Sequence, residues 1–197
     1  MKKPLIALAA AAALMGTAAC GRSHADEPAV NEPAATPEAG PEVVSRATSA
    51  TGDSYARLNE AMGAEGPWVF GATSHIEAAE PILIEGNVYK NNNEEEGYMR
   101  KIGLYRRAGN GDRTIVEVFN LTAPTITTHA ENTRIMGGIV DGHKAEVHSD
   151  IYVNAPGFIL EDVDVHGDVI FATEAYRDSA SIEETGGVVH GEIRVAE

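Results

Sequence analysis

The phrase VHGDVIF occupies residues 165–171, and two variants repeat its pattern, VHSDIYV at 147–153 and VHGEIRV at 189–195. Each reads valine, histidine, a small residue, an acid, a β-branched residue, any residue and an apolar residue, and the starts lie 18 and 24 residues apart. Repeats of about 20 residues, rich in β-branched and small turn residues, are typical of solenoids, in which each turn of the chain buries its inward side chains against the next. We therefore expect a mostly β domain built as a single-stranded parallel β-helix, or β-solenoid.

The repeat also predicts which side chains face inward, because successive side chains of a strand point to opposite faces. The small third residue suits a corner between strands. The longer spacing before the last variant leaves AYRDSA (175–180), which we expect to bulge at a corner, and IEGNVYK (84–90) is a weaker fourth copy. The predicted inward columns are Val147, Val165 and Val189; Ile151, Val169 and Ile193; and Val153, Phe171 and Val195.

A helix is expected ahead of the strands, at residues 53–62. Asp53 and Ser54 are common helix caps, apolar residues then recur at helical spacing, and Gly63 ends the pattern. Such a helix would cap the N-terminal end of the solenoid and cover an edge of unpaired backbone groups. Farther along, AGNGD (108–112) between two apolar runs predicts a hairpin. The expected buried face of the helix is Tyr55, Leu58, Ala61 and Met62.

The N-terminal segment has the layout of an exported protein. Two lysines precede an apolar run that is too short for a comfortable transmembrane helix, and small residues follow, so we expect residues 1–19 to be a signal peptide. The stretch LMGTAAC, which ends at Cys20, resembles the lipobox of bacterial lipoproteins. That resemblance implies a lipid on Cys20 and, because Gly21 follows, an outer-membrane lipoprotein that faces the periplasm or the surface. The alternative is a freely secreted protein.

Residues 20–49 are expected to form a disordered linker between this lipid and the domain. The part at 21–45 is rich in Pro, Ala and Glu and has no aromatic residue. Such a segment cannot bury enough surface to offset the entropy of ordering it. The β-helix domain would then span residues 50–197, a length that suits one domain.

The net charge of the chain limits the classes of molecule that it is expected to bind. With a formal net charge of −15, the protein repels nucleic acid, so nucleic acid is not expected to bind, and the membrane would be reached through the lipid anchor. Cations, basic proteins and neutral glycans remain as partners. Cys20 is the only cysteine, so the domain cannot form an internal disulfide and depends on packing.

Two stretches resemble known β-solenoid families. The helix at 53–62 with PWVFGATSHIEAAEPILIEGNV (67–88) resembles the entry of right-handed parallel β-helix proteins of the pectate-lyase-like group. This resemblance implies outward aspartates that hold calcium and an arginine that acts as base. Residues 147–195 are similar to the short coils of bactofilins, the bacterial polymer-forming β-solenoids, which normally lack a cleaved secretory signal.

The histidines of the repeat are the first candidate site. They share one repeat position, so adjacent turns would place neighbouring imidazoles about 5 Å apart, and an acid follows each histidine two residues on. Neutral imidazoles beside a carboxylate suit Zn, Cu or Ni. The alternative is a solvent-facing ladder that repeat duplication alone explains. The candidate ligands of a divalent metal are His148, His166, His190, Asp150 and Asp168.

Other chemistry is less well supported. In EDVDVHGD (161–168), Asp162 and Asp164 offer oxygen ligands for calcium, but no arginine lies in register beside them. The repeat places one aromatic side chain, Tyr152, outward, where it could stack on a sugar ring. The sequence contains no nucleophile elbow and no phosphate-binding loop, so we assign no catalytic residue.

Two functions remain open. The first is a non-enzymatic, envelope-anchored β-solenoid that acts as a structural or binding module. The second is a small carbohydrate-active β-helix protein, either a glycan binder or a polysaccharide lyase-like enzyme. No helix pattern follows the last turn at residues 192–197. That open edge favours self-association.

Overall fold

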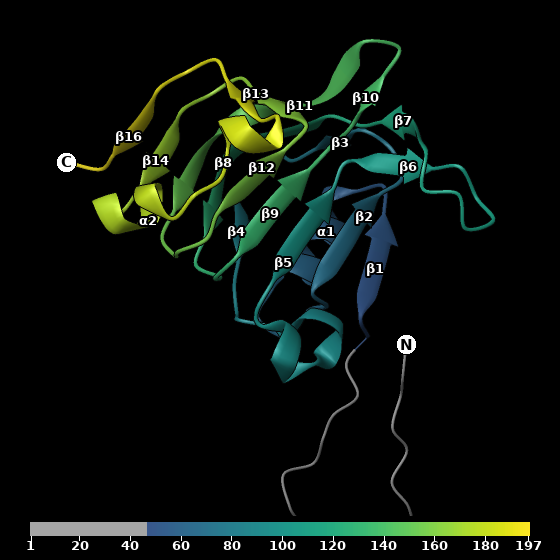
Figure 1. The fold of residues 1–197 in the computed structure, drawn as a ribbon, viewed down its shortest axis with the longest axis horizontal. Helices are drawn as coiled ribbons and strands as arrows, with labels where there is room; N and C mark the ends of the chain where they lie inside the picture. The colour runs from purple at the N-terminus through teal and green to yellow at the C-terminus, as the bar shows by residue number, and fades with distance from the viewer. Residues whose placement is uncertain (1–46) are drawn as a thin grey trace, which may run out of the picture. The chain divides into compact units, whose positions relative to one another are not determined.

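The computed structural model describes residues 47–197, which are mostly β-strands in parallel sheets (Figure 1). The predicted signal peptide (1–19), the lipidation site Cys20 and the linker as far as residue 46 lie outside the described residues. The first strand begins at Ser49. The β domain therefore starts one residue before the boundary expected at residue 50.

Two sheets contain most of the strands. The first is parallel throughout and has the order β1 (Ser49–Gly52), β2 (Val69–Ala72), β5 (Arg100–Gly103), β9 (Thr133–Met136) and β12 (Ile159–Glu161). The second contains β3 (Ile76–Glu77), β4 (Ile82–Ile84), β8 (Leu121–Thr128), β11 (His143–Val153), β13 (Val163–Val165), β14 (Val169–Phe171), β15 (Val188–Val189) and β16 (Ile193–Val195) in parallel pairs, with β10 (Ile139–Val140) antiparallel to β11.

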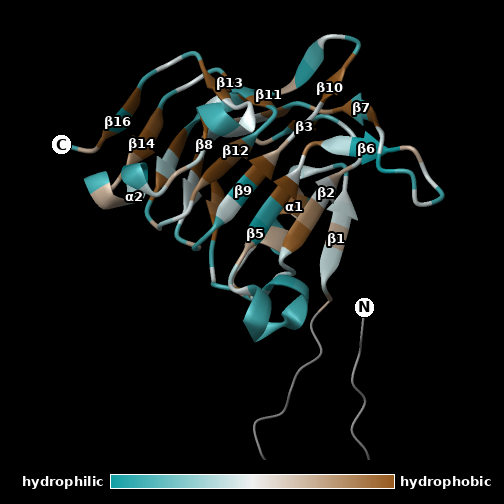
Figure 2. Cartoon of the chain, viewed as in Figure 1, coloured by the Kyte–Doolittle hydropathy of each residue, from teal (hydrophilic) through white to brown (hydrophobic). Residues whose placement is uncertain are grey.

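The chain visits the two sheets in alternation, and each visit adds a strand beside the previous one. β2 is followed by β3 and β4, β5 by β8, β9 by β11, and β12 by β13 and β14 (Figure 1). The predicted hairpin around AGNGD is confirmed as β6 (Tyr105–Arg107) paired with β7 (Ile115–Val118), and it is inserted between β5 and β8. The inward side chains of both sheets join one buried apolar cluster, and the strands carry most of the hydrophobic colour in Figure 2.

The predicted columns of the repeat are confirmed in the strand register. Val147 pairs with Val165, which pairs with Val189, and the two following columns align in the same way along β11, β14 and β16. Within these columns Ile151, Val169 and Phe171 are fully buried. Val189 and Val195 are only partly buried, and Ile193 is exposed. The period-two assignment therefore identified the core along β11, β13 and β14 but not at the last strands, β15 and β16.

The fourth copy of the repeat, IEGNVYK at 84–90, is wrong. Ile84 is in register with Thr128, which is in register with Val153, so it occupies the last position of the repeat rather than the first. The residue that shares a column with Val147 is Ile76, through Leu121. The β6–β7 and β10 insertions lengthen the chain between successive paired strands of the second sheet, and this conceals the register in the sequence.

The predicted N-terminal helix is α1 (Tyr55–Met62). It packs against β1 and β2, the first two strands of the first sheet, and against β4 of the second sheet, and it buries Leu58, Ala61 and Met62. Tyr55 lies half-buried at the edge of the core, with its hydroxyl donating to the Pro81 carbonyl. Ser54 is the N-cap residue, but its side chain makes no capping hydrogen bond. The helix therefore depends on its apolar face rather than on its cap.

The other helical segments are short and lie in the connections. The six residues expected to bulge overlap α2 (Glu174–Asp178), where the Thr173 hydroxyl accepts a hydrogen bond from the Tyr176 amide. The 3-10 turns are η1 (Lys90–Asn92), η2 (Glu94–Glu96) and η3 (Glu183–Thr185). Extra residues in the connections between strands are thus folded into local helices without altering the register of the strands.

The small residue of the repeat is required by close approach of adjacent turns. A Cβ built on Gly167 would lie 2.2 Å from the Ser149 carbonyl oxygen, and one on Gly191 would lie 2.5 Å from the Gly167 carbonyl oxygen. Ser149 faces a different neighbour. At that point β8 carries two residues, Ala123 and Pro124, against one on β11, and such a bulge bends a strand away. This is why serine is accommodated in the first variant and glycine in the next two.

One buried charge was not predicted. Arg100, on β5, is completely buried and donates hydrogen bonds to the carbonyl oxygens of Ala61, Gly63 and Gly66 at 2.8, 3.0 and 3.2 Å. These carbonyls end α1 and form the turn that follows it, and helix ends leave such carbonyls without intrahelical partners. The arginine therefore joins the first sheet to the helix that covers its early strands.

Candidate functional site

The three repeat histidines form a stacked column. The His148 and His166 rings lie 4.7 Å apart between centroids and 9° from parallel, and those of His166 and His190 lie 4.5 Å and 11° apart. The predicted spacing of neighbouring imidazoles is therefore confirmed. His148, His166 and His190 together form the histidine column.

Backbone hydrogen bonds set this spacing. The His166 amide donates to the Val147 carbonyl at 2.8 Å, and the His190 amide donates to the Val165 carbonyl at 2.9 Å. Each histidine therefore sits directly beside the one in the preceding turn, because parallel strands repeat their side chains in register. The column is a property of the sheet and not of flexible side chains alone.

The carboxylates that face the column come from a different repeat position than expected. Glu146 Oε2 lies 3.0 Å from His148 Nε2, and Glu146 Oε1 lies 4.0 Å from His166 Nε2. Asp164 Oδ2 lies 4.0 Å from His190 Nε2. Glu146 and Asp164 lie two residues before His148 and His166, respectively, on the same outward face of their strands. The alternation of the strand was the signal that could have identified them.

The carboxylates of the predicted ligands Asp150 and Asp168 accept hydrogen bonds from backbone amides. Asp150 Oδ1 accepts a hydrogen bond from the Asp168 amide, and Asp168 Oδ1 accepts one from the Glu192 amide, each at 2.9 Å. Arg194 Nε also lies 3.4 Å from Asp168 Oδ2. Each aspartate thus ties its own turn to the next. Among the described residues, the group with the spacing of a metal site contains His148 and His166 with Glu146, and it does not include His190, Asp150 or Asp168.

One group of the described residues has the composition and spacing of a metal site. Glu146, His148 and His166 each offer a ligand atom, and these atoms all lie within 4.8 Å of one another. The side chains of His148 and His166 are 41% and 38% exposed. Water could therefore reach an ion here and complete a coordination shell that the protein fills only in part.

The two aspartates considered as calcium ligands, Asp162 and Asp164, lie in different surroundings. Asp164 forms an ion pair with Lys144 at 3.0 Å. Asp162 lies at a corner between β12 and β13, with φ at 50° in the left-handed region that aspartate tolerates. The two carboxylates are thus explained by a charge partner and a turn.

Two tyrosines of the loop between β4 and β5 contact each other. Tyr89 and Tyr98 stack with centroids 4.6 Å apart, and their hydroxyls lie 3.2 Å apart. That hydrogen bond from Tyr98 is the main reason why the pKa of Tyr89 is raised to about 12. In the same loop, the ion pair with Lys90 lowers the pKa of Glu96. Tyr152 does face outward beside Ile170, which is in register with Arg194, as predicted.

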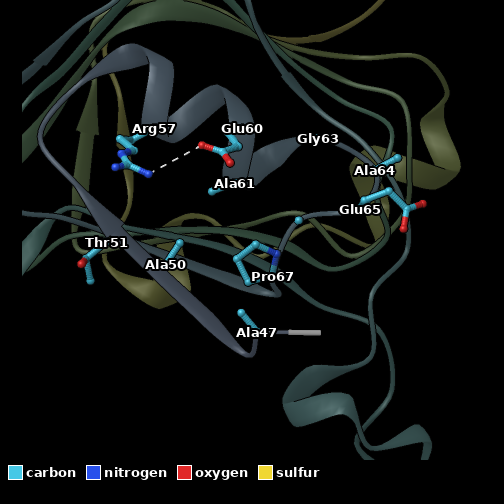
Figure 3. A pocket seen from close by; sticks show the side chains of 11 residues that line it. Ala47, Ala50, Thr51, Arg57, Glu60, Ala61, Gly63, Ala64, Glu65 and Pro67 are labelled. Atoms are coloured by element: carbon cyan, nitrogen blue, oxygen red, sulfur yellow. Dashed lines mark ion pairs between the residues drawn. The ribbon is translucent and has the colours of Figure 1, made fainter. Parts of the chain in front are cut away.

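A cavity of about 570 Å³ lies elsewhere, between α1, β1 and the turn that follows the helix (Figure 3). Its wall is largely alanine, glycine and proline, and its charged rim includes Arg57 and Glu60, which form an ion pair at 3.8 Å. No residue of the histidine column, and neither Glu146 nor Asp164, lines this cavity. The candidate metal ligands are therefore on an open surface.

Comparison with known proteins found no matching family model, no matching curated protein and no matching solved structure. Within residues 47–197, none of the helices has the length and apolar character needed to cross a membrane.

Proposed function

We propose that this protein is a non-enzymatic binding module of the cell envelope, in which a parallel β-solenoid presents the histidine column to divalent transition-metal ions. The observation that carries the proposal is the triad of Glu146, His148 and His166, with ligand atoms within 4.8 Å of one another. Zn²⁺, Ni²⁺ and Cu²⁺ favour imidazole nitrogen, and a carboxylate completes many of their sites.

The strand order supports the solenoid. In the first sheet, spatial order equals chain order, and in the second, successive visits place Ile151, Val169 and Ile193 in one column. A chain that alternates between two parallel sheets in this way advances by one strand spacing for each turn. The handedness that we propose, right-handed, follows the resemblance to pectate-lyase-like proteins and the general rule for crossovers between parallel strands.

The histidine column can hold an ion after a small rotation of its rings. Two nitrogen ligands of a tetrahedral zinc ion lie about 3.3 Å apart. The His148 and His166 rings are nearly parallel, with centroids 4.7 Å apart, so the rings must tilt to bring their Nε2 atoms closer together. Glu146 already lies on the Nε2 side of both rings. The backbone needs no change, because the sheet places both Cα atoms in register.

The open position of the triad favours binding over catalysis. Catalytic metals are generally held in concave sites that exclude water and orient a substrate. The triad lies on an exposed sheet surface, whereas the large cavity is at α1 and contains none of the triad residues. Attachment to the outer membrane through Cys20 would place such a site outside the cytoplasm, and secretion without a lipid is the alternative.

A second candidate is glycan binding, and one residue favours it. Tyr152 is 37% exposed on the outer face of β11, beside Ile170 of the next strand. An exposed aromatic ring on a flat sheet can stack on a sugar. Tyr152→Ala would then abolish binding of a neutral polysaccharide without affecting metal binding, as measured by affinity electrophoresis.

The metal proposal is tested by titrating the full chain with ZnCl₂, NiCl₂ and CaCl₂ in a calorimeter. We expect Zn²⁺ and Ni²⁺ to bind and Ca²⁺ not to bind. His166→Ala should weaken binding by at least about 10-fold, because it removes one of the three protein ligands, and loss of an outer-shell partner alone costs about 10- to 100-fold. His143→Ala is the matched control, since His143 is exposed on the same strand but outside the triad, and its affinity should be unchanged. A flat trace with all three metals, or equal binding by both variants, would overturn the proposal.

A further inference from the structure

The two ends of the second sheet differ in how they are covered. At the N-terminal end, α1 packs against β4, and the inward residues Ile82 and Ile84 are fully buried. At the other end, among residues 47–197, β14 is the one strand paired with β16, and α2 contacts both of these strands (Figure 1). Ile193 is 41% exposed although it shares a column with fully buried Ile151 and Val169. The column thus ends in an apolar side chain that the described chain covers only in part.

The hydrogen bonds of β16 show which backbone groups face this open side. The Val169 amide donates to the Glu192 carbonyl, and the Ala196 amide donates to the Phe171 carbonyl. In a parallel pair, alternate residues of a strand direct both of their backbone groups to the same neighbour. Residues 192, 194 and 196 therefore face β14, and the backbone groups of Gly191, Ile193 and Val195 face away from it.

We propose that β16 pairs antiparallel with β16 of a second copy of this chain, with Ile193 opposite Ile193. In an antiparallel pair about a two-fold axis, each residue lies opposite the residue that is equally far from the central residue on the other side. Centring on Ile193 places Gly191 opposite Val195 and Glu192 opposite Arg194. The residues with outward backbone groups thus meet one another, and each can exchange hydrogen bonds across the axis.

Charge supports the same register. Glu192 of each copy faces Arg194 of the other, on the outer face of the joined sheet. Within one chain, Arg194 Nε lies 3.4 Å from Asp168 Oδ2 and 4.0 Å from Glu192 Oε2. The side chains of Glu192 and Arg194 are nevertheless 79% and 42% exposed, so both can also be reached by a second copy. Centring on Arg194 instead would place two arginines opposite each other and would use backbone groups that already bond to β14. Backbone geometry and charge therefore select one pairing, and the apolar Ile193 and Val195 side chains share its inner face.

Cross-linking tests the register directly. Cys20 is replaced by serine, so that a cysteine introduced as Ile193→Cys is the only thiol in the full chain. Directly opposed residues of a hydrogen-bonded antiparallel pair have Cα atoms about 5.5 Å apart, which is within the range of a disulfide. Mild oxidation should then produce a disulfide-linked dimer. Val188→Cys is the control, because Val188 has similar exposure, 39%, but lies on β15. Equal yields of dimer from the two variants would overturn the proposal.

Charge exchange provides a second, reversible test by sedimentation velocity over a range of concentrations. We expect the full chain to dimerise, and Glu192→Arg to weaken the dimer by more than about tenfold, because two pairs of like charges are then opposed. Adding Arg194→Glu to that variant restores opposite charges and should restore the dimer. A strict monomer at every concentration, or a double variant as weak as the single one, would contradict the pairing. Neither test involves the metal ligands, so this proposal and the proposed function can fail separately.

Discussion

Gly167→Ala is expected to destabilise the domain by about 3 to 5 kcal/mol. The added Cβ would lie 2.2 Å from the Ser149 carbonyl oxygen and 2.5 Å from its carbon. Both contacts are to backbone, so no side-chain rotation relieves them. The adjacent turns would have to separate at this corner, which also weakens the bond from the Asp168 amide to Asp150. Urea denaturation followed by circular dichroism measures the loss.

Gly109→Ala is the matched control for this substitution. A Cβ at Gly109 meets nothing within 4 Å, and its φ is not in the left-handed region. Its free energy of unfolding should change by less than about 0.5 kcal/mol. If Gly167→Ala were as stable as Gly109→Ala, the adjacent turns could not be as close as described, and the explanation for glycine in the repeat would be wrong.

Arg100→Met should lower the free energy of unfolding by on the order of 4 kcal/mol. Methionine preserves much of the buried volume but removes the guanidinium, which donates to the carbonyls of Ala61, Gly63 and Gly66. Those carbonyls would lose this donor at the end of α1. We expect the helix to lose contact with the first sheet before the rest of the domain unfolds, and hydrogen exchange of the α1 amides would detect this.

The control for the arginine is Arg106→Met on β6. Arg106 forms an ion pair with Glu117 at 2.7 Å, but its side chain is 60% exposed. Exposed ion pairs contribute little, so this variant should lose less than about 1 kcal/mol. Equal losses of unfolding free energy for the two variants would mean that burial and the three carbonyl contacts do not give Arg100 a larger contribution to stability.

The sequence determined the parts of this protein that depend on local alternation and repetition. The inward columns of residues 147–195 follow from period two, because a parallel strand in register repeats its neighbour's side chains. The stacking of His148, His166 and His190 follows from the same register. The buried face of α1 follows from helical spacing, which is again a local property.

Only the tertiary structure decided which groups from distant turns meet. Insertions change the length of each early turn, so Ile76 rather than Ile84 shares a column with Val147. Strand alternation within β11 places Glu146 and Asp150 on the same face as His148, but Asp150 accepts a hydrogen bond from the Asp168 amide, whereas Glu146 lies beside the rings.

Arg100 is the clearest case of such long-range dependence. Its carbonyl partners lie 34 to 39 residues earlier in the chain. No local pattern marks a strand arginine as buried, because burial of a charge depends on partners that only the folded chain brings within reach. The repeat thus defines the columns of the sheet, and contacts across long sequence separations define the corners, the helix attachment and the carboxylate of the candidate site.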